Sequence, residues 1–319
     1  MQQPAESLAA AEAAEWARRT LDLVERAVVG KRAVAELCLV CAVAQGHLLL
    51  EDAPGVGKTT LARALAAALG LRFSRVQCTS DLLPSDILGV NVFDQAKASF
   101  AFRPGPIFHE VVLVDELNRA SPRTQSALLE AMAEGSVSLE GVAHPLPRPF
   151  WLLATQNPLE HAGTYPLPDS QLDRFLLRLS LGYPPPAAER ALVVHGERRR
   201  SVPPRPDPGG LELAELQEAA ERVRMAPEVA DYLLRIVEAT RQSPLLSAGA
   251  STRGALLLAA ACRERALLRG RDFVLPDDVK ALAVPSLSHR VTLAGVARAP
   301  SIAESERIVM DLLERVPLP

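Results

Sequence analysis

The segment HLLLEDAPGVGKTTLARALAAALG, residues 47–70, constrains the fold of this chain more than any other stretch. It opens with the apolar run Leu48–Leu50, typical of a short buried strand, and a loop with two glycines follows. Apolar residues at helical spacing then continue from Leu61 to Gly70, a glycine that predicts the C-terminal cap of a helix. Strand, glycine loop, Lys-Thr and helix in this order predict a phosphate-binding loop.

The residues of this loop fit a nucleotide phosphate. Glycines let backbone N–H groups turn toward an anion, which also sits at the positive end of the new helix. Lys58 opens that helix, where the helix dipole disfavours a cation, so an anion is expected there. We expect Lys58 to reach the β- and γ-phosphates and the Thr59 hydroxyl to hold Mg²⁺. The predicted nucleotide-binding residues of the loop are Pro54, Gly55, Val56, Gly57, Lys58, Thr59 and Thr60.

One position departs from the pattern GxxxxGK[ST]. Asp52 stands where the first glycine is usual. A plain glycine turn with a solvated Lys58 is the alternative interpretation, but the strand and the helix around the loop favour the nucleotide. Only the glycines nearest the phosphates are sterically essential, so we expect Asp52 to be tolerated.

Polar residues follow two further apolar strands. Val111–Val114 is a β-branched run typical of a central parallel strand, and Asp115 and Glu116 come directly after it. Acids at the end of a buried strand need a chemical reason, because burying charge is costly. We expect Asp115 to orient Mg²⁺ and Glu116 to take a proton from an attacking water. Asn157 follows the predicted strand 151–155 and is expected beside the γ-phosphate, although Asn-Pro also opens ordinary turns.

Composition excludes several classes of protein. The chain has 319 residues, 48% apolar and 23% charged, which is ordinary for a globular protein and long enough for two domains. The net charge of −3 gives no basic field for nucleic acid. The N-terminus does not read as a signal peptide, and the longest apolar runs are too short to span a bilayer. We therefore expect a soluble, cytoplasmic protein.

The cysteines do not predict a disulfide framework. Cys38 and Cys41 have the CxxC spacing of some metal and redox sites, but they lie on the apolar stripe of a predicted helix. No second Cys or His pair is spaced to complete a zinc site. Packing in the core is therefore the favoured interpretation.

The remaining pattern divides the chain into an α/β part and a helical part. The first part contains helices at 5–28 and 32–45, a strand at 71–77, a polar stretch at 79–106, a helix that starts at Ser121-Pro122, a hairpin at 136–146 and a strand at 175–179. The polar stretch is too long for a plain connection, so it is an inserted element or a functional loop. We predict a three-layer αβα core with a parallel sheet over residues 1–200.

A Pro- and Arg-rich linker at 201–210 should separate this core from a small all-α domain at 211–319. Its predicted helices are 211–223, 227–242, 252–269, 276–284 and 302–315, with no strand. Arg253 lies in the first turn of one of them, where a cation is disfavoured. It is either a solvated arginine or a phosphate contact from a lid.

Taken together, these motifs resemble the AAA+ ATPases, and more narrowly the MoxR family. The resemblance covers nearly the whole chain. It rests on VVGKRAV (29–35), EDAPGVGKTTLARALA (51–66), DLLPSDILG (81–89), GPIF (105–108), VDELNRASPRTQSALLEAMAEG (114–135), ATQNPLEHAGTYPLPDSQLDRF (154–175), STRGALLLAA (251–260) and RGRDFVLPDDVKALA (269–283).

The resemblance implies positions for the shared ATPase motifs. Walker A falls on 52–59, Walker B on 111–116 and sensor 1 on Asn157. The stretch at about 81–106 resembles the insert in the second helix, and about 136–146 resembles the hairpin before sensor 1.

The resemblance also implies specific roles for four further residues. Arg174 is similar to the arginine finger that reaches a neighbouring subunit's γ-phosphate, and Arg253 resembles sensor 2. Val29 and Gly30 resemble the segment that packs near adenine. The implied ligands are ATP and Mg²⁺.

The family also implies partners. Such proteins usually form hexameric rings, and MoxR proteins are thought to act as chaperones that remodel or activate clients, often proteins with von Willebrand A-type domains. A nucleic-acid-remodelling motor and a nucleotide-switched scaffold with little turnover are the alternatives. The motor is disfavoured, since 81–106 holds only Lys97 and Arg103 as cations and 136–146 holds none.

Overall fold

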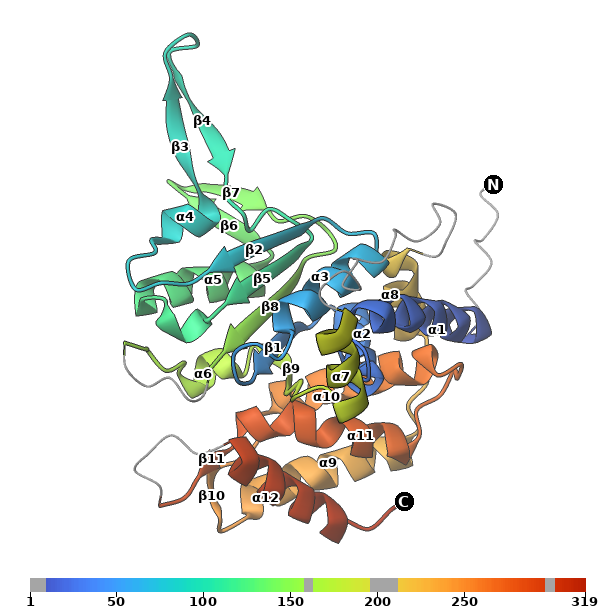
Figure 1. The fold of residues 1–319 in the computed structure, drawn as a ribbon. Helices are drawn as coiled ribbons and strands as arrows, with labels where there is room; N and C mark the ends of the chain where they lie inside the picture. The colour runs from blue at the N-terminus through green and yellow to red at the C-terminus, as the bar shows by residue number, and fades with distance from the viewer. Residues whose placement is uncertain (1–9, 158–162, 196–211, 296–301) are drawn as a thin grey trace, which may run out of the picture.

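The computed structural model describes residues 10–157, 163–195, 212–295 and 302–319, and every structural statement below concerns those residues. They form an αβα core with a helical lid beneath it in Figure 1. The linker expected at 201–210 lies outside the described residues. None of the described helices is both long and apolar enough to cross a membrane.

A five-stranded parallel sheet is the centre of the core. Its strands are His47–Glu51 (β1), Phe73–Gln77 (β2), Val111–Asp115 (β5), Trp151–Gln156 (β8) and Phe175–Leu179 (β9). They stand in the order β2-β5-β8-β1-β9, and each neighbouring pair is parallel. All five strands expected from the sequence are confirmed, and their carboxyl ends meet at one edge of the sheet.

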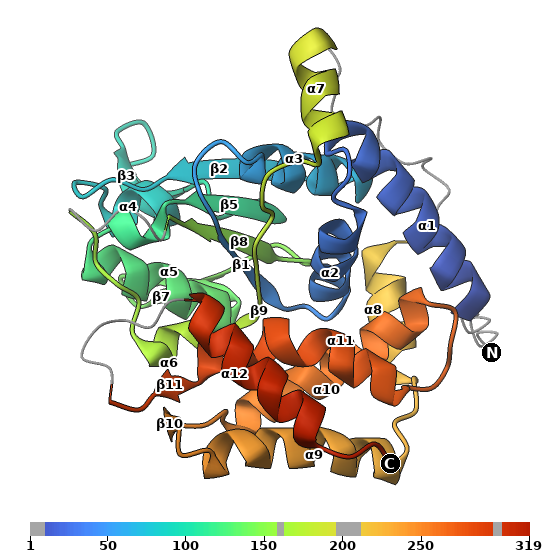
Figure 2. The same cartoon turned by 60° about the horizontal axis from the view of Figure 1, so that its bottom comes forward.

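Alternate side chains of the strands enter two apolar layers. The covering helices are Ala10–Ala27 (α1), Arg32–Val43 (α2), Lys58–Ala68 (α3) and Pro122–Glu134 (α5). Leu48 and Leu50 belong to a cluster shared with α1, α2 and α3. Leu49, between them, belongs to a second cluster shared with α5. Because successive strand residues point to opposite faces, the sheet lies between two helical layers, and the predicted three-layer core is confirmed (Figures 1 and 2).

Two β-hairpins extend the core. The stretch 79–106 is an inserted element, in which a short helix precedes a hairpin that projects far from the sheet (Figure 1). The hairpin predicted at 136–146 is also present. Their elements are Pro84–Leu88 (α4), Gly89–Asp94 (β3), Ser99–Pro104 (β4), Ser136–Leu139 (β6) and Val142–Pro145 (β7). The two hairpins touch, since the rings of Phe102 and His144 stack with centroids 3.9 Å apart.

The lid contains the five predicted helices. They are Leu213–Glu221 (α8), Pro227–Gln242 (α9), Thr252–Leu268 (α10), Pro276–Leu287 (α11) and Ile302–Arg315 (α12). The expectation of helices alone is wrong, because Leu246–Ala248 (β10) pairs antiparallel with Thr292–Leu293 (β11). Strands of three and two residues are too short to show an alternating pattern. The sequence also did not predict Asp169–Leu172 (α6), Pro186–His195 (α7) and the 3₁₀ turns Leu117–Arg119 (η1) and Ser288–Arg290 (η3).

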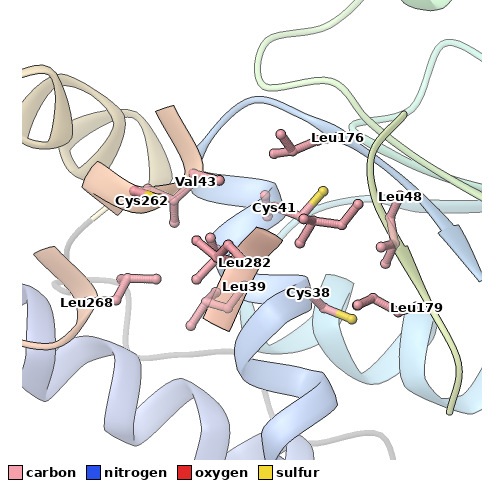
Figure 3. Packing of buried hydrophobic residues seen from close by; sticks show 14 of the residues in the cluster. Cys38, Leu39, Cys41, Val43, Leu48, Leu176, Leu179, Cys262, Leu268 and Leu282 are labelled. Atoms are coloured by element: carbon pink, nitrogen blue, oxygen red, sulfur yellow. The ribbon is translucent and has the colours of Figure 1, made fainter. Parts of the chain in front are cut away.

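Helix α2 packs between the sheet and the lid (Figure 3). Its Cys38 and Cys41 are fully buried in one apolar cluster with Leu176, Leu179 and the lid residue Leu282. Burial raises the pKa of the Cys41 thiol to about 12. The described residues hold no group of three or more His, Cys, Asp or Glu side chains that could bind a metal. The packing interpretation of the CxxC pair is confirmed.

Glu264 on α10 is a buried acid in the lid. It is 7% exposed, and its Oε2 atom has no hydrogen-bond partner. Burial raises the pKa of this carboxyl from 4.5 to about 9, with Arg263 opposing and Glu221 reinforcing the change. Glu264 is therefore protonated at neutral pH in the folded protein.

This raised pKa predicts a pH-dependent stability difference. The unfolded chain loses the Glu264 proton above its ordinary pKa of 4.5 while the folded chain keeps it, so this group's stabilisation is lost as pH rises. Glu264→Gln imitates the neutral acid. Its free energy of unfolding should therefore rise relative to that of wild type by about 1.4 kcal/mol per pH unit between about pH 5 and 8. Denaturant unfolding across this range measures the difference. The exposed control Glu218→Gln should show no such slope, and a constant difference for Glu264→Gln would contradict the prediction.

Candidate active site

The phosphate-binding loop joins strand β1 to helix α3. Gly55 and Gly57 have φ angles of 82° and 103°, in the left-handed region that favours glycine. Gly57 is the N-cap of α3, and Lys58 is the first helical residue. The backbone N–H groups at the start of α3 are therefore available to an anion, as the sequence predicts.

The Lys58 side chain folds back over the loop. Its Nζ donates hydrogen bonds to the carbonyl oxygens of Asp52, at 2.6 Å, and Ala53, at 3.0 Å. Burial lowers the pKa of Lys58, and the carboxylates of Asp52, Asp115 and Glu116 act against this change. The ammonium group thus stands at the mouth of the loop, among acids rather than in open solvent.

Asp52, the departure from the usual loop pattern, ties the loop to the chain after strand β9. Its Oδ2 accepts hydrogen bonds from the Gly182 N–H, at 2.6 Å, and the Ser180 hydroxyl, at 2.9 Å. Its Oδ1 accepts one from the Ala53 N–H at 3.0 Å. Burial opposes ionisation, but these hydrogen bonds outweigh it and lower the pKa of Asp52. A glycine could not make this connection, which the sequence pattern did not reveal.

Asp115 contacts polar side chains from three other elements of the site. It is 8% exposed and accepts a hydrogen bond from the Thr155 hydroxyl at 2.5 Å. The Thr59 hydroxyl lies 3.5 Å from its Oδ2. Arg75, on the neighbouring strand β2, pairs with the same Oδ2 through Nη2 at 2.6 Å and Nε at 3.2 Å. Arg75 and Thr155 were not singled out from the sequence, because only the register of the parallel sheet places them beside Asp115.

Glu116 adopts a left-handed backbone conformation, with φ 57°. Its N–H donates to the Thr155 hydroxyl at 2.9 Å, and Arg119 pairs with its Oε2 at 2.9 Å. Thr155 therefore anchors both acids of the pair, one through each polar function of a single hydroxyl.

Most of the predicted residues of the phosphate-binding loop, together with Asp115, Glu116 and Asn157, surround one cavity of about 330 Å³. Its lining comprises Pro54, Gly55, Gly57, Lys58, Thr59, Thr60, Arg75, Gln77, Asp115, Glu116, Thr155, Gln156 and Asn157. Asn157 is 5% exposed there. Residues from the carboxyl ends of β2, β5 and β8 thus meet the loop after β1 and the start of α3.

A second cavity of about 260 Å³ adjoins the loop on its other side. Val29 and Val56 lie on it, as do Tyr183, Glu189 and Leu192, which the sequence did not indicate. Gly30 is not on its lining. A Cβ at Gly30, where φ is 74°, would come within 2.8 Å of Pro185, so this glycine permits close packing of the two chain segments.

The two predicted arginines, like Gly30, line neither cavity. Arg174, at the start of β9, donates from Nη1 to the Leu129 carbonyl oxygen of α5 at 2.8 Å. Arg253 is exposed in the first turn of α10, behind the N-cap Ser251. Within the described residues, the cavity around Lys58 therefore contains neither of these arginines.

Fold and site define a phosphate-loop ATPase. The family model described as "ATPase family associated with various cellular activities (AAA)" matches residues 47–177, and that of the AAA lid domain matches 238–312. A crystal structure of a protein from Cytophaga hutchinsonii superposes with a TM-score of 0.84 at 32% identity, covering 97% of each chain.

Similar sequences narrow this class. The chain is 40% identical over 312 residues to chaperone MoxR1 of Mycobacterium tuberculosis, and the aligned region covers 94% of this chain and 82% of MoxR1. It is 44% identical over 302 residues to the uncharacterized protein YeaC of Bacillus subtilis, with 94% of each covered. It is 30% identical over 321 residues to protein MoxR of Methylorubrum extorquens, with 93% of each covered. The chain belongs to the MoxR family of AAA+ ATPases, and it is a nucleotide-binding protein that hydrolyses ATP.

The Arg75–Asp115 ion pair predicts competition with a metal cation. Arg75 is partly exposed, so its pair is worth about 1 kcal/mol or less, and removing it should strengthen metal-dependent binding about fivefold. We expect Arg75→Gln to raise the ratio of nucleotide affinities measured with and without Mg²⁺ by calorimetry. Arg72→Gln, which removes a comparable pair with Glu110, is the matched control and should leave the ratio unchanged. An unchanged ratio in Arg75→Gln would contradict the competition.

Proposed function

We propose that this ATPase works as a ring of identical subunits, with six expected, in which two neighbours share each ATP, and that it remodels or activates partner proteins in the cytoplasm. One observation carries the proposal. Lys58, Asp115 and Glu116 surround a single cavity, whereas Arg174 lines neither that cavity nor the adjoining one. Arg75 also lines the cavity but is paired with Asp115, so we assign the further positive charge for the transferring phosphoryl group to Arg174 of another subunit.

The site fits ATP with Mg²⁺. The loop N–H groups and Lys58 bind the β- and γ-phosphates, while Val29 and Tyr183 line the adjoining cavity on the side we assign to adenine. Thr59 and Asp115 offer hard oxygen ligands 3.5 Å apart, the donor type that magnesium prefers. When bound, Mg²⁺ offsets the charge of the phosphates.

Two residues handle the attacking water in this mechanism. The Oε2 atom of Glu116 pairs with Arg119, which leaves Oε1 to accept the proton of the water. Asn157, on the next strand end, orients the same water through its amide. The Thr155 hydroxyl fixes the backbone of Glu116, so the carboxylate stays at the mouth of the cavity.

Arg174 and Arg253 act on the nucleotide of an adjacent subunit. They belong together by position, because Ser251, the N-cap before Arg253, lies 3.4 Å from Asp173, the residue before Arg174. Arg174 has to leave the Leu129 carbonyl oxygen to make this contact. Hydrolysis then depends on assembly.

The client is a protein, and a protein with a von Willebrand A-type domain is the partner class that the family resemblance favours. Chaperone MoxR1 supports remodelling as the general task. The projecting hairpin adds support, since Phe93 and Phe100 on it are 51% and 70% exposed.

Subunit mixing tests the shared site. Arg174→Ala should bind ATP with wild-type affinity but hydrolyse it roughly 10³-fold more slowly, because a missing arginine finger costs at least this much in related chemistry. Mixing it with Glu116→Gln subunits, which keep Arg174, should restore part of the turnover in a phosphate-release assay. Arg235→Ala, an exposed change on α9, is the control and should keep full activity. If no mixture exceeds both parents, the neighbour does not supply the arginine.

Capture of partners tests the client class. Glu116→Gln loaded with ATP should stay in the bound state and retain proteins that leave wild type on hydrolysis. We expect a von Willebrand A-type protein to be enriched over Lys58→Ala bait, which should not bind ATP. Nuclease-sensitive retention of DNA or RNA in place of protein would instead support the motor alternative.

A further inference from the structure

Arg290 of the lid penetrates the core beside the predicted arginine finger. It lies at the end of the 3₁₀ turn η3, and its side chain is 1% exposed. Its Nε pairs with Asp173 Oδ1 at 2.9 Å. Burial lowers the pKa of Arg290 to about 10, with Asp173 opposing the change, so the guanidinium keeps its charge at neutral pH.

The same guanidinium holds the main chain on both sides of Arg174. It donates to the carbonyl oxygens of Asp173, at 3.2 Å, and Leu176, at 3.2 Å, and also to that of Phe175. On its own side it donates to the Ser286 carbonyl oxygen. One lid side chain thus fixes the backbone from 173 to 176, and Arg174 is the second residue of that stretch.

A second lid element closes on the same acid. The hydroxyl of Ser251, the N-cap of α10, lies 3.4 Å from both carboxylate oxygens of Asp173. Gly254, in the first turn of α10, leaves no room for a side chain, because a Cβ there would stand 2.8 Å from Cδ of Arg290. The first turn of α10, η3 and the segment before β9 are therefore packed around one ion pair.

We propose that the Asp173–Arg290 pair is a positioning element that sets the reach of Arg174 toward the neighbouring subunit according to the orientation of its own lid. The inference rests on the proposed function, in which Arg174 acts in trans. Neither partner of the pair lines a nucleotide cavity. Because the Arg290 guanidinium is buried and bonded to three carbonyl groups on both sides of Arg174, a rotation of the lid has to shift the backbone that carries Arg174 or break the pair.

Asp173→Asn tests the pair, since the amide keeps the size of the side chain but removes its charge. Turnover should fall roughly 10- to 100-fold, the cost of displacing a catalytic group by about 1 Å, while ATP affinity stays within about twofold of wild type. Asp169→Asn is the matched control. It removes the charge from another contact between α6 and the lid, the hydrogen bond that the Thr292 hydroxyl donates to Asp169 at 2.8 Å, and should change turnover less than about twofold.

Mixing with Glu116→Gln subunits distinguishes a misplaced Arg174 from a general loss of activity in Asp173→Asn. In a mixture with Glu116→Gln, the active pockets belong to Asp173→Asn subunits and the fingers to their partners. The rate should then rise to that of the Arg174→Ala plus Glu116→Gln mixture. A slower Asp173→Asn mixture, or wild-type turnover of Asp173→Asn alone, would overturn the positioning role while leaving the trans finger intact. Failure of the Arg174→Ala mixture would instead overturn the proposed function.

A second variant covers the case in which Asp173→Asn does not fold. Gly254→Ala presses a methyl group on Arg290 without changing any charge. It should show the same pattern in milder form, with lower turnover, unchanged ATP affinity and recovery on mixing. Full activity of a folded Gly254→Ala protein would count against the pair as a positioning element.

Discussion

Parallel pairing of β1 with β8, and of β8 with β5, places three distant chain segments at one edge of the sheet. Everything in the site depends on this constraint. It brings Asp115 and Thr155 to within hydrogen-bond distance and opens both toward the start of α3. Because β1 and β5 are buried on both faces, a shift in register would expose apolar residues as well as disperse the site.

Each acid at this edge already has a positive or N–H partner. Asp115 pairs with Arg75, Glu116 with Arg119, and Asp52 with the N–H groups of Ala53 and Gly182. A metal ion bound with the triphosphate competes with Arg75 for Asp115, so the first of these contacts has to rearrange, whereas the Glu116–Arg119 pair leaves Oε1 of Glu116 available to the attacking water. Asp52 lines neither cavity, so its contacts do not have to change when the nucleotide binds.

The parts of this protein that the sequence predicted share a local origin. Each of these features can be predicted from a few neighbouring residues: the glycines before Lys58, the Ser121 cap and the apolar run that ends in Asp115. Arg75, Asp173 and Arg290 were missed, because a charged residue in sequence looks the same whether it is solvated or paired across the fold. The pairing of β10 with β11 was missed for a related reason, since it depends on a partner about 45 residues away rather than on its own pattern.

Strand β9 is held at both ends by residues of different function. After its carboxyl end, Ser180 and Gly182 bind Asp52 of the phosphate-binding loop. At its amino end, Arg290 of the lid donates hydrogen bonds to backbone carbonyl oxygens on both sides of Arg174. Leu177–Leu179 pair in register with Leu48–Leu50 of β1, and the register shifts between Phe175 and Leu177, so paired backbone with one irregularity joins these two points. Strand β9 thus connects the phosphate-binding loop to the lid and to the arginine of the same subunit. In the ring proposed above, this strand would link the state of one pocket to that of the next.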